Sequence, residues 1–269
     1  MSPTGRPEDE YRSAKREGVG AVLSVIVIAK NEEASIARTL RSVAFADEIV
    51  VVDSGSDDRT ADIAREHGAK VSVTADWPGF GPQKNRALDL ATGDWVLSLD
   101  ADEWLTDASA AEIRRAIASA SRDVVAYRVP RRSSFCGRFM RHSGWWPDYV
   151  VRLFRRDRGR FSADIVHERL VVDGAVATLT EPMLHETFVD LDDLVEKMNR
   201  YSTASAEQLR REGRAAGLGE AIARGLWAFF RTYVLRAGFL DGREGFMLAV
   251  ATAEGTYYRY AKLMRLPRR

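Results

Sequence analysis

Hydrophobic and polar residues form alternating blocks along the first half of the chain. Residues 22–29 are almost entirely apolar and rich in Val and Ile, which predicts a strand buried on both faces of a parallel sheet. Ile36, Leu40 and Val43 then recur at helical spacing, which predicts a helix that opens near Asn31. The same alternation predicts strands over 48–53, 70–73 and 95–99 and helices over 58–66, 83–91 and 108–119. This order favours a parallel sheet with a ligand site at the carboxyl ends of its strands.

The second half of the chain has a different pattern. Short apolar segments between turn residues predict antiparallel hairpins, including one that joins 168–172 to 175–179 across Asp173-Gly174. Beyond about Asp190 the apolar residues return to helical spacing, which predicts several helices. The expected fold class is therefore α/β, with a mostly parallel central sheet, a β-rich second half and a C-terminal helical extension.

Composition excludes several classes of protein. The 269 residues include 40 Lys and Arg against 39 Asp and Glu, and this balance does not suggest a nucleic-acid partner. Cys136 is the single cysteine, so an internal disulfide is excluded and a reducing compartment is favoured.

Residues 1–20 are charged and contain no apolar run, which predicts a flexible tail rather than a secretion signal. The longest uncharged apolar runs, such as 245–253, are shorter than the roughly 18 residues that span a bilayer. We therefore expect a cytoplasmic protein that is not integral to a membrane.

The strongest chemical signal is a pair of aspartates, Asp100 and Asp102, where the predicted strand 95–99 ends. Alternation along an extended chain puts both carboxylates on one side. Carboxylate oxygens at such an edge suit a hard cation such as Mg²⁺ or Mn²⁺, which in turn neutralises a diphosphate. Glu103 adds a third carboxylate. The alternative is that these residues only cap a helix or lie in a solvated loop.

Two further groups of polar residues follow predicted strands. Asp53 comes directly after an apolar strand, a position from which a carboxylate commonly holds a nucleoside base or ribose. Ser56 or Asp57 is expected to cap the helix that follows. Glu32 is a second candidate nucleoside ligand at the tip of the first strand, where Asn31 either caps a helix or takes part in the same site.

Lys84 and Arg86 stand in the first turn of the predicted helix 83–91, after the glycine-rich turn Gly79-Phe80-Gly81. Cations are disfavoured at a helix N-terminus, so this placement calls for a reason. A bound diphosphate at the start of the helix would supply one. Plain solvent exposure of both basic side chains is the alternative, and the sequence does not separate the two.

With these segments in order, residues 22–105 resemble family 2 of the nucleotide-sugar glycosyltransferases. The matching stretches are SVIVIAKNEEASIARTLRSV, EIVVVDSGSDDRTADIA and GFGPQKNRALDLATGDWVLSLDADE. The resemblance implies a GT-A fold, a Rossmann-like fold that binds nucleotide-diphospho-sugars. It also implies that Asp53 and the Asn31-Glu32 region contact the nucleoside of the donor. Asp100 and Asp102 would serve the donor diphosphate and its divalent cation.

Later segments are similar to bacterial lipopolysaccharide core glycosyltransferases within that family, namely GWWPDYVVRLFRR, VHERL, LHETF and FLDG. This resemblance implies inverting transfer of a hexose, with glucose from UDP-glucose as the leading donor. The acceptor would be a hydroxyl of a glycolipid or cell-envelope glycan such as lipopolysaccharide core. Three alternatives remain: a polyprenyl-phosphate sugar transferase of the same fold, a sugar-nucleotide nucleotidyltransferase, and a non-catalytic carbohydrate-binding protein.

Inversion at the anomeric carbon is a single in-line displacement, so the acceptor hydroxyl needs a general base. The family places its base in the region of Glu168, and Asp148 is the second candidate. In the alternative interpretation Glu168 only pairs with Arg169 or Arg152. His185 is expected either to complete the coordination of the metal or to be structural. The aromatic run that begins at Trp145 is a candidate acceptor surface, because aromatic faces stack on sugar rings.

We expect three parts along the chain: a tail over 1–20, a GT-A catalytic domain over 21–188 and a helical extension over 189–269. Within the catalytic domain, 21–105 would bind the nucleotide sugar and 106–188 the acceptor.

Residues 224–269 carry nine basic residues against three acidic ones, interspersed with aromatic residues. Such a segment suits the surface of an anionic bilayer, which predicts peripheral contact with the cytoplasmic face of the inner membrane. The alternative is that its aromatic residues pack on the catalytic domain. The sequence does not predict the oligomeric state.

Overall fold

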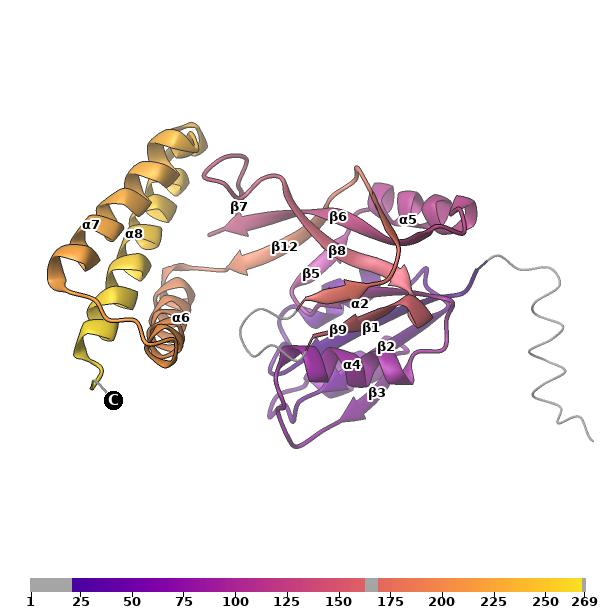
Figure 1. Ribbon diagram of the computed structural model, residues 1–269. Helices are drawn as coiled ribbons and strands as arrows, with labels where there is room; N and C mark the ends of the chain where they lie inside the picture. The colour runs from indigo at the N-terminus through magenta and orange to yellow at the C-terminus, as the bar shows by residue number, and fades with distance from the viewer. Residues whose placement is uncertain (1–20, 163–168, 268–269) are drawn as a thin grey trace, which may run out of the picture. The chain divides into compact units, whose positions relative to one another are not determined.

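The computed structural model describes residues 21–162 and 169–267 (Figure 1). Its contacts divide the chain into two compact units. Unit 1 comprises the described residues of Met1–Val129 and Val150–Met183, and unit 2 those of Pro130–Tyr149 and Leu184–Arg269. Three strands therefore belong in part to each unit. The predicted division into a catalytic domain and a helical extension stays a prediction.

Unit 1 begins with four parallel strands, which are β1 (Leu23–Ala29), β2 (Glu48–Asp53), β3 (Lys70–Val73) and β4 (Trp95–Asp100). β1 lies between β2 and β4, and all seven of its residues are buried. The bounds of β2 and β3 are the predicted ones, and β1 and β4 differ from the prediction by one residue each. The prediction that the first strand is buried on both faces of a parallel sheet is confirmed, since β1 and its neighbours β2 and β4 contribute to an apolar cluster on each face.

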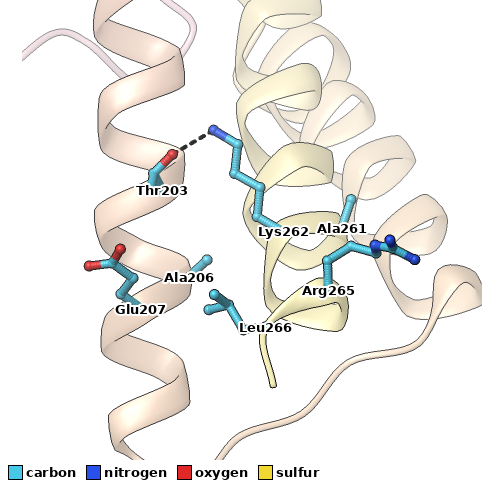
Figure 2. A pocket seen from close by; sticks show the side chains of 7 residues that line it. All are labelled: Thr203, Ala206, Glu207, Ala261, Lys262, Arg265 and Leu266. Atoms are coloured by element: carbon cyan, nitrogen blue, oxygen red, sulfur yellow. Dashed lines mark hydrogen bonds between the residues drawn. The ribbon is translucent and has the colours of Figure 1, made fainter. Parts of the chain in front are cut away.

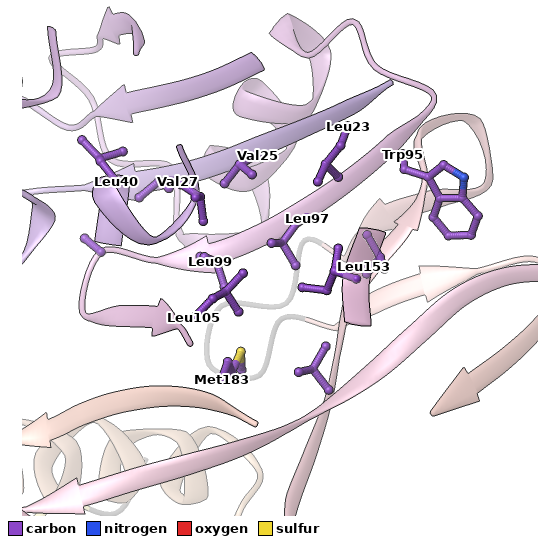
Figure 3. Packing of buried hydrophobic residues seen from close by; sticks show 14 of the residues in the cluster. Leu23, Val25, Val27, Leu40, Trp95, Leu97, Leu99, Leu105, Leu153 and Met183 are labelled. Carbon is purple, nitrogen blue, oxygen red and sulfur yellow. The ribbon is translucent and has the colours of Figure 1, made fainter. Parts of the chain in front are cut away.

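The two clusters follow the alternation of side chains along β1. Leu23, Val25 and Val27 pack on one face with Leu97 and Leu99 of β4, as Figure 3 shows. Ile26 and Ile28 point to the other face, where they pack against α4 through Ala87 and Leu88. Because both faces are filled, the packing of the core determines where the residues at the carboxyl edge of the sheet lie.

The helices of unit 1 are α2 (Ile36–Ser42), α3 (Thr60–Glu66), α4 (Phe80–Leu90) and α5 (Asp107–Ser119). The prediction that the first helix opens near Asn31 is wrong, because Asn31 has a φ of 55° and helical geometry begins only at Ile36. The start predicted for the third helix is also wrong. α4 begins at Phe80 rather than at Gln83, so Lys84 lies in its second turn, where the unpaired N–H groups of a helix start are no longer exposed.

The remaining strands are β5 (Glu103–Leu105), β6 (Val124–Phe135), β7 (Arg138–Phe139), β8 (Asp148–Arg155), β9 (Gly159–Phe161), β10 (Leu170–Val172), β11 (Ala175–Thr178) and β12 (Met183–Phe188). The main sheet has the order β3-β2-β1-β4-β8-β6-β12-β5, with β7 and β11 also paired to β6. A short 3₁₀ turn, η1 (Arg156–Arg158), joins β8 to β9.

The predicted hairpin across Asp173-Gly174 is wrong. β10 pairs antiparallel with β9, whereas β11 pairs parallel with β6. A tight type I′ hairpin turn needs a positive φ at both central residues, but of these two only Gly174 has one. The backbone N–H of Asp173 instead donates to Arg158, and that of Ala175 donates to Asp123, so the chain leaves one sheet and enters the other at this point.

Unit 2 contains the predicted helices, which are α6 (Leu191–Arg211), α7 (Leu218–Phe230), the π-helical turn η2 (Arg231–Leu235), the 3₁₀ turn η3 (Gly238–Asp241) and α8 (Gly242–Arg265). Asp190 caps α6, since its side chain accepts a hydrogen bond from the backbone N–H of Asp193. Among the helices that the structure describes, none is both long and apolar enough to cross a bilayer.

Lys262 of α8 joins two helices of unit 2. Its Nζ donates to Oγ1 of Thr203 at 2.8 Å and to Oγ of Ser202 at 2.8 Å, both on α6, and Figure 2 shows the contact with Thr203. A cavity of about 420 Å³ beside this contact is lined by seven residues, namely Thr203, Ala206, Glu207, Ala261, Lys262, Arg265 and Leu266. The aliphatic part of Lys262 thus covers apolar surface while its charge is held by hydroxyl oxygens.

Candidate active site

The carboxyl ends of the central strands bring the predicted site residues of unit 1 to one edge of the sheet. The register pairs Ala29, the last residue of β1, with Asp53, the last residue of β2. On the other side of β1, Ile28 is paired with Asp100, the last residue of β4. The loops that follow these three strands therefore start at the same level, as expected of a ligand site in a parallel sheet.

Four charged side chains form a cluster at the end of β4, in which only Asp100 is partly exposed. Lys84 Nζ lies 3.0 Å from Asp100 Oδ1, and Arg152 donates to Asp100 Oδ2 at 2.6 Å. The same guanidinium donates to Glu103 Oε1 at 2.6 Å, and Glu103 Oε2 accepts from the backbone N–H of Asp100 at 3.0 Å. Two cations and two carboxylates thus neutralise one another within unit 1. Ion pairing of this kind is what makes buried charge tolerable.

The cluster fixes the charge state of Asp100. Burial alone would raise the pKa of this carboxyl, but the charges of Arg152 and Lys84 outweigh it and hold the pKa well below its usual range. Arg152 shows the reverse balance, since burial would lower its pKa and the charges of Asp100 and Glu103 raise it. Asp100 is therefore a permanent anion at physiological pH, held in place by two cations.

The donor set for a metal is smaller than the sequence suggested. Glu103 is fully buried and turned toward Arg152, and both oxygens of Asp100 face cations. Asp102 is half-buried in the turn between β4 and β5. No three His, Cys, Asp or Glu side chains within residues 21–162 and 169–267 are grouped to hold a metal ion. Mg²⁺ commonly takes only one or two protein carboxylates, and its other ligands are water and substrate phosphates, so this donor set fits a metal that arrives with a diphosphate.

Asp53 orders the loop after β2. It is buried, and its Oδ2 accepts from the backbone N–H groups of Gly55 at 3.1 Å and Ser56 at 2.9 Å, while the Ser56 hydroxyl donates to Oδ1. Gly55 has a φ of 73°, a conformation that glycine adopts without strain. Asp53 thus holds a tight turn, and contact with a nucleoside stays a prediction.

Asn31 and Glu32 are tied to the same loop. The backbone N–H of Asn31 donates to the Ser56 hydroxyl at 2.8 Å, and Asn31 Oδ1 accepts from the N–H of Asp57 at 2.9 Å. The Glu32 carboxylate accepts from the hydroxyl of Ser35 at 2.6 Å. Asn31 does not cap α2, because that helix begins at Ile36 and its N-cap position is Ser35. A nucleoside contact of Asn31 or Glu32 stays a prediction.

The helix caps predicted near this loop are wrong. Neither Ser56 nor Asp57 caps α3; the carboxylate of Asp58 accepts from the backbone N–H of Thr60 at 2.9 Å instead. The reason is that α3 begins at Thr60 and its N-cap position is Arg59, so Ser56 and Asp57 both lie before the cap position.

Lys84 and Arg86 have different surroundings. Only 5% of the Lys84 side chain is exposed, so the interpretation of solvent exposure is wrong for this residue. Arg86 forms a two-pronged ion pair with Asp76, at 2.9 and 2.7 Å, on the surface. The structure therefore brings Lys84 to Asp100, and it brings Arg86 to Asp76. A diphosphate contact of either stays a prediction.

Unit 2 also contains a polar pocket of about 300 Å³. Arg131 donates to Asp148 Oδ2 through both Nε, at 3.0 Å, and a terminal nitrogen, at 2.6 Å. His185 Nδ1 lies 3.0 Å from the hydroxyls of both Ser133 and Thr187. The pocket is lined by Arg131, Ser133, Gly144, Trp145, Asp148, His185 and Thr187. It joins Asp148, His185 and Trp145, three residues that the sequence had singled out for separate reasons.

Several of these residues were not predicted to take part in a site. Arg152 had been considered only as a partner of Glu168, although a single arginine inside the apolar run 150–154 is a signal of a buried ion pair. Arg131, Ser133 and Thr187 carry no motif, and only the folded chain brings them together. Glu168, the predicted base, and its neighbour His167 lie outside the described residues.

A site at the carboxyl edge of a parallel sheet is typical of α/β proteins that bind nucleotides. Residues 24–177 match the family described as Glycosyl transferase family 2, and the chain belongs to that family. The GT-A fold expected from the sequence, with its mostly parallel central sheet and C-terminal helices, is confirmed. The protein is accordingly a glycosyltransferase.

Curated relatives cover most of the chain. The lipopolysaccharide core biosynthesis glycosyltransferase LpsC of Rhizobium meliloti is 32% identical over 262 residues, which are 89% of this chain and 93% of LpsC. An uncharacterised glycosyltransferase of Rickettsia typhi is 31% identical over 91% of this chain and 87% of its own length. The similarity to lipopolysaccharide core glycosyltransferases is thereby confirmed.

Solved structures show weaker similarity. Mannosyl-3-phosphoglycerate synthase from Rubrobacter xylanophilus is 20% identical with a TM-score of 0.48, over 76% of this chain and 79% of the other. Glucosyl-3-phosphoglycerate synthase from Mycobacterium tuberculosis, in a complex with Mn²⁺, UDP and glucosyl-3-phosphoglycerate, is 26% identical with a TM-score of 0.38, over 49% of this chain and 50% of the other.

Proposed function

We propose that this protein is an inverting hexosyltransferase that moves glucose from UDP-glucose to a hydroxyl of a cell-envelope glycolipid or glycan, such as lipopolysaccharide core. The observation that carries the proposal is the pair Asp100 and Asp102 at the end of β4, of which Asp100 is fixed by Lys84 and Arg152. The similarity to LpsC supports the class of acceptor.

The donor site is proposed to lie at the carboxyl edge of the unit 1 sheet. Asp102 would be the ligand of a Mg²⁺ or Mn²⁺ ion, because both oxygens of Asp100 already face cations. Asp100 would act as a positioning residue that holds the turn carrying Asp102. Asp53 and the Asn31-Glu32 region would contact the nucleoside, and Lys84 and Arg86 would add positive charge near the diphosphate.

In the proposed reaction the acceptor oxygen attacks the anomeric carbon as the bond from that carbon to the diphosphate oxygen breaks. The acceptor proton passes to the carboxylate of Glu168, with Asp148 as the second candidate base. A divalent cation held by Asp102 would stabilise the charge on the leaving diphosphate. Lys84 and Arg152 would offset the charge of the Asp100 carboxylate, which reduces its repulsion of that diphosphate.

The polar pocket of unit 2 is proposed to take a sugar of the acceptor. Hydroxyl groups, a carboxylate and a guanidinium match the hydrogen-bonding groups of a sugar, and Trp145 offers an aromatic surface. His185 lies in this pocket with Nδ1 beside two hydroxyls, so we assign it to the acceptor in preference to the metal. A glycolipid acceptor would be met at the cytoplasmic face of a membrane, where the basic and aromatic C-terminal segment would make peripheral contact.

Calorimetric titration of UDP, GDP, ADP and CMP into the protein, with and without Mn²⁺, tests the donor site. Binding of UDP alone that requires Mn²⁺ is the expected result. Binding of another nucleoside diphosphate would reassign the donor, and binding of none would favour a carbohydrate-binding protein without a donor. A nucleotidyltransferase is disfavoured by the segment after β1, where Lys30-Asn31-Glu32-Glu33 stands in place of a glycine-rich, basic phosphate loop.

A further inference from the structure

Helix α7 turns its small residues inward. Ala221, Gly225 and Ala228 are its buried residues, and they lie on the side that packs against α8. A Cβ atom on Gly225 would come within 3.3 Å of the backbone oxygen of Ala253 and of Tyr257. The close approach of the two helices therefore depends on small side chains, as in helix pairs whose backbones lie near each other.

The large apolar side chains of the same helix point outward. Ile222, Leu226, Phe230 and Val234 follow one another at intervals of four residues, and each is at least 44% exposed. Trp227, beside them, is 56% exposed. A helix of a globular protein normally buries such a stripe and exposes its polar side. In α7 the buried side carries only Ala and Gly, and the large apolar side chains are the exposed ones.

The exposed apolar surface continues beyond the helix. Leu235 in η2 and Phe239 and Leu240 in η3 are each more than half exposed. We call the whole surface the α7 face, and it consists of Ile222, Leu226, Trp227, Phe230, Val234, Leu235, Phe239 and Leu240. Large exposed apolar side chains gathered in one short segment are typical of a contact with a partner.

The charge around the α7 face is positive. Between residues 218 and 240 the chain carries Arg224, Arg231 and Arg236 but only one acid, Glu220. Arg224 donates to Glu220 at 2.7 Å and lies over the ring of Tyr260 on α8, so Arg231 and Arg236 carry the net positive charge of this segment. Long arginine side chains at the edge of an apolar stripe can place their charge at the level of lipid headgroups.

We propose that the α7 face docks on the surface of an anionic bilayer, with α7 parallel to the membrane plane and its large apolar side chains among the acyl chains. The charge selects this partner over a second copy of the chain, because two copies meeting face to face would bring their arginines together. A helix of 13 residues is about 20 Å long and lies within the interface rather than across it. This proposal identifies the surface that makes the membrane contact of the proposed function. It rests on the proposed function only in the reason for the contact, which is access to a glycolipid acceptor.

The test is flotation of the full chain with vesicles of phosphatidylcholine alone and with vesicles containing about 30% phosphatidylglycerol. The expected result is binding to the anionic vesicles that weakens as salt is raised, because charges near the surface are screened. In the variant Leu226→Gln/Phe230→Gln, partition into anionic vesicles should fall about tenfold or more, since two apolar anchors are lost.

A matched control removes two apolar side chains elsewhere in unit 2. Leu191 and Val195 on α6 are 49% and 55% exposed, so the variant Leu191→Gln/Val195→Gln should bind vesicles as the unchanged protein does. Equal loss in both variants, or vesicle binding retained by Leu226→Gln/Phe230→Gln, would overturn the proposal. Sedimentation equilibrium measures the oligomeric state of the same variants. A dimer that dissociates only in Leu226→Gln/Phe230→Gln would also overturn the proposal. Manganese-dependent UDP binding is measured on the same samples, so failure of the donor site and failure of docking are seen separately.

Discussion

The Nζ atom of Lys84 lies 3.0 Å from Oδ1 of Asp100, and it reaches this position from the second turn of α4 with 5% of its side chain exposed. A lysine at this depth requires a partner, since burying an unpaired ammonium group is strongly unfavourable. α4 packs on the same face of the sheet as Ile26 and Ile28, so its own burial fixes where Lys84 can reach. The pair therefore links the packing of the core to the position of a site carboxylate.

Replacing Lys84 with Met should destabilise the protein. Methionine fills a similar volume but leaves Asp100 with Arg152 as its one described cationic partner. Removal of one partner from a fully buried pair costs about 3–5 kcal/mol, and since a third of the Asp100 side chain is exposed we expect about 2–3 kcal/mol. Urea unfolding followed by circular dichroism measures this difference.

Arg86→Met provides the matched control for Lys84→Met. Arg86 stands two positions along the same helix and is also ion-paired, but its partner Asp76 is on the surface. We expect little change in the free energy of unfolding, because exposed ion pairs contribute little. Equal effects of the two substitutions would show that the buried pair has no special role.

The stability that Asp100 provides should depend on pH. Its folded-state pKa lies below its unfolded value of about 3.9, so the contribution is fully present above that value and is lost as the pH falls toward the folded pKa. Asp100→Asn should therefore be less stable than the unchanged protein at pH 7, and the gap should narrow below about pH 4. Chemical denaturation at several pH values measures the gap.

A control for this pH dependence is Asp123→Asn, which changes an exposed carboxylate at a turn. Its free energy of unfolding should stay close to that of the unchanged protein at every pH. If the difference in free energy of unfolding between Asp100→Asn and the unchanged protein is constant from pH 7 to pH 3, the charge of Asp100 does not contribute to stability.

The buried strands could be predicted from the sequence because their apolar runs leave few other arrangements. β2 is almost entirely buried and has the predicted bounds, and the prediction for the fully buried β1 differed by one residue. The start of α2 could not be predicted in the same way, because Asn31 is engaged by a residue from the next loop, Asp57. Hydrogen bonds between segments far apart in sequence decide where that helix begins, and local patterns carry no trace of them.

The candidate site was predictable to a similar extent. Asp100 and Asp102 follow a buried strand and could be found from that position alone. The roles of Lys84 and Arg152 could not, since each depends on a contact with Asp100 across elements that only the folded sheet brings together. The hairpin at Asp173-Gly174 shows the opposite error, in which a strong local signal was overridden by pairing with β6.

Asp102→Asn should remove the metal dependence of donor binding. The substitution keeps the size of the side chain but removes the charge that holds a divalent cation. We expect UDP affinity in the presence of Mn²⁺ to fall to its metal-free value and kcat/KM to fall by about 100-fold or more. Calorimetry with and without Mn²⁺ measures the first effect, with Asp123→Asn as the control. Unchanged manganese-dependent binding in Asp102→Asn would remove this residue from the metal site.

Glu168→Gln and Asp148→Asn together identify the base. If Glu168 takes the acceptor proton, Glu168→Gln should lower kcat by about 10²–10⁴-fold, leave UDP binding unchanged and abolish the acidic limb of the pH–rate profile. Asp148→Asn should mainly raise KM for the acceptor, because Asp148 is held by Arg131 in the unit 2 pocket and a neutral amide weakens that pair. Steady-state kinetics with an acceptor glycan or glycolipid measures both variants.

The opposite outcome would reassign the base. If Asp148→Asn lowers kcat and abolishes the acidic limb while Glu168→Gln changes neither, the proton goes to Asp148 and Glu168 has another role. The two substitutions are expected to change different kinetic parameters. A general loss of folding would lower the active fraction, and therefore kcat, without changing the acceptor KM or the pH profile. It therefore cannot imitate either result.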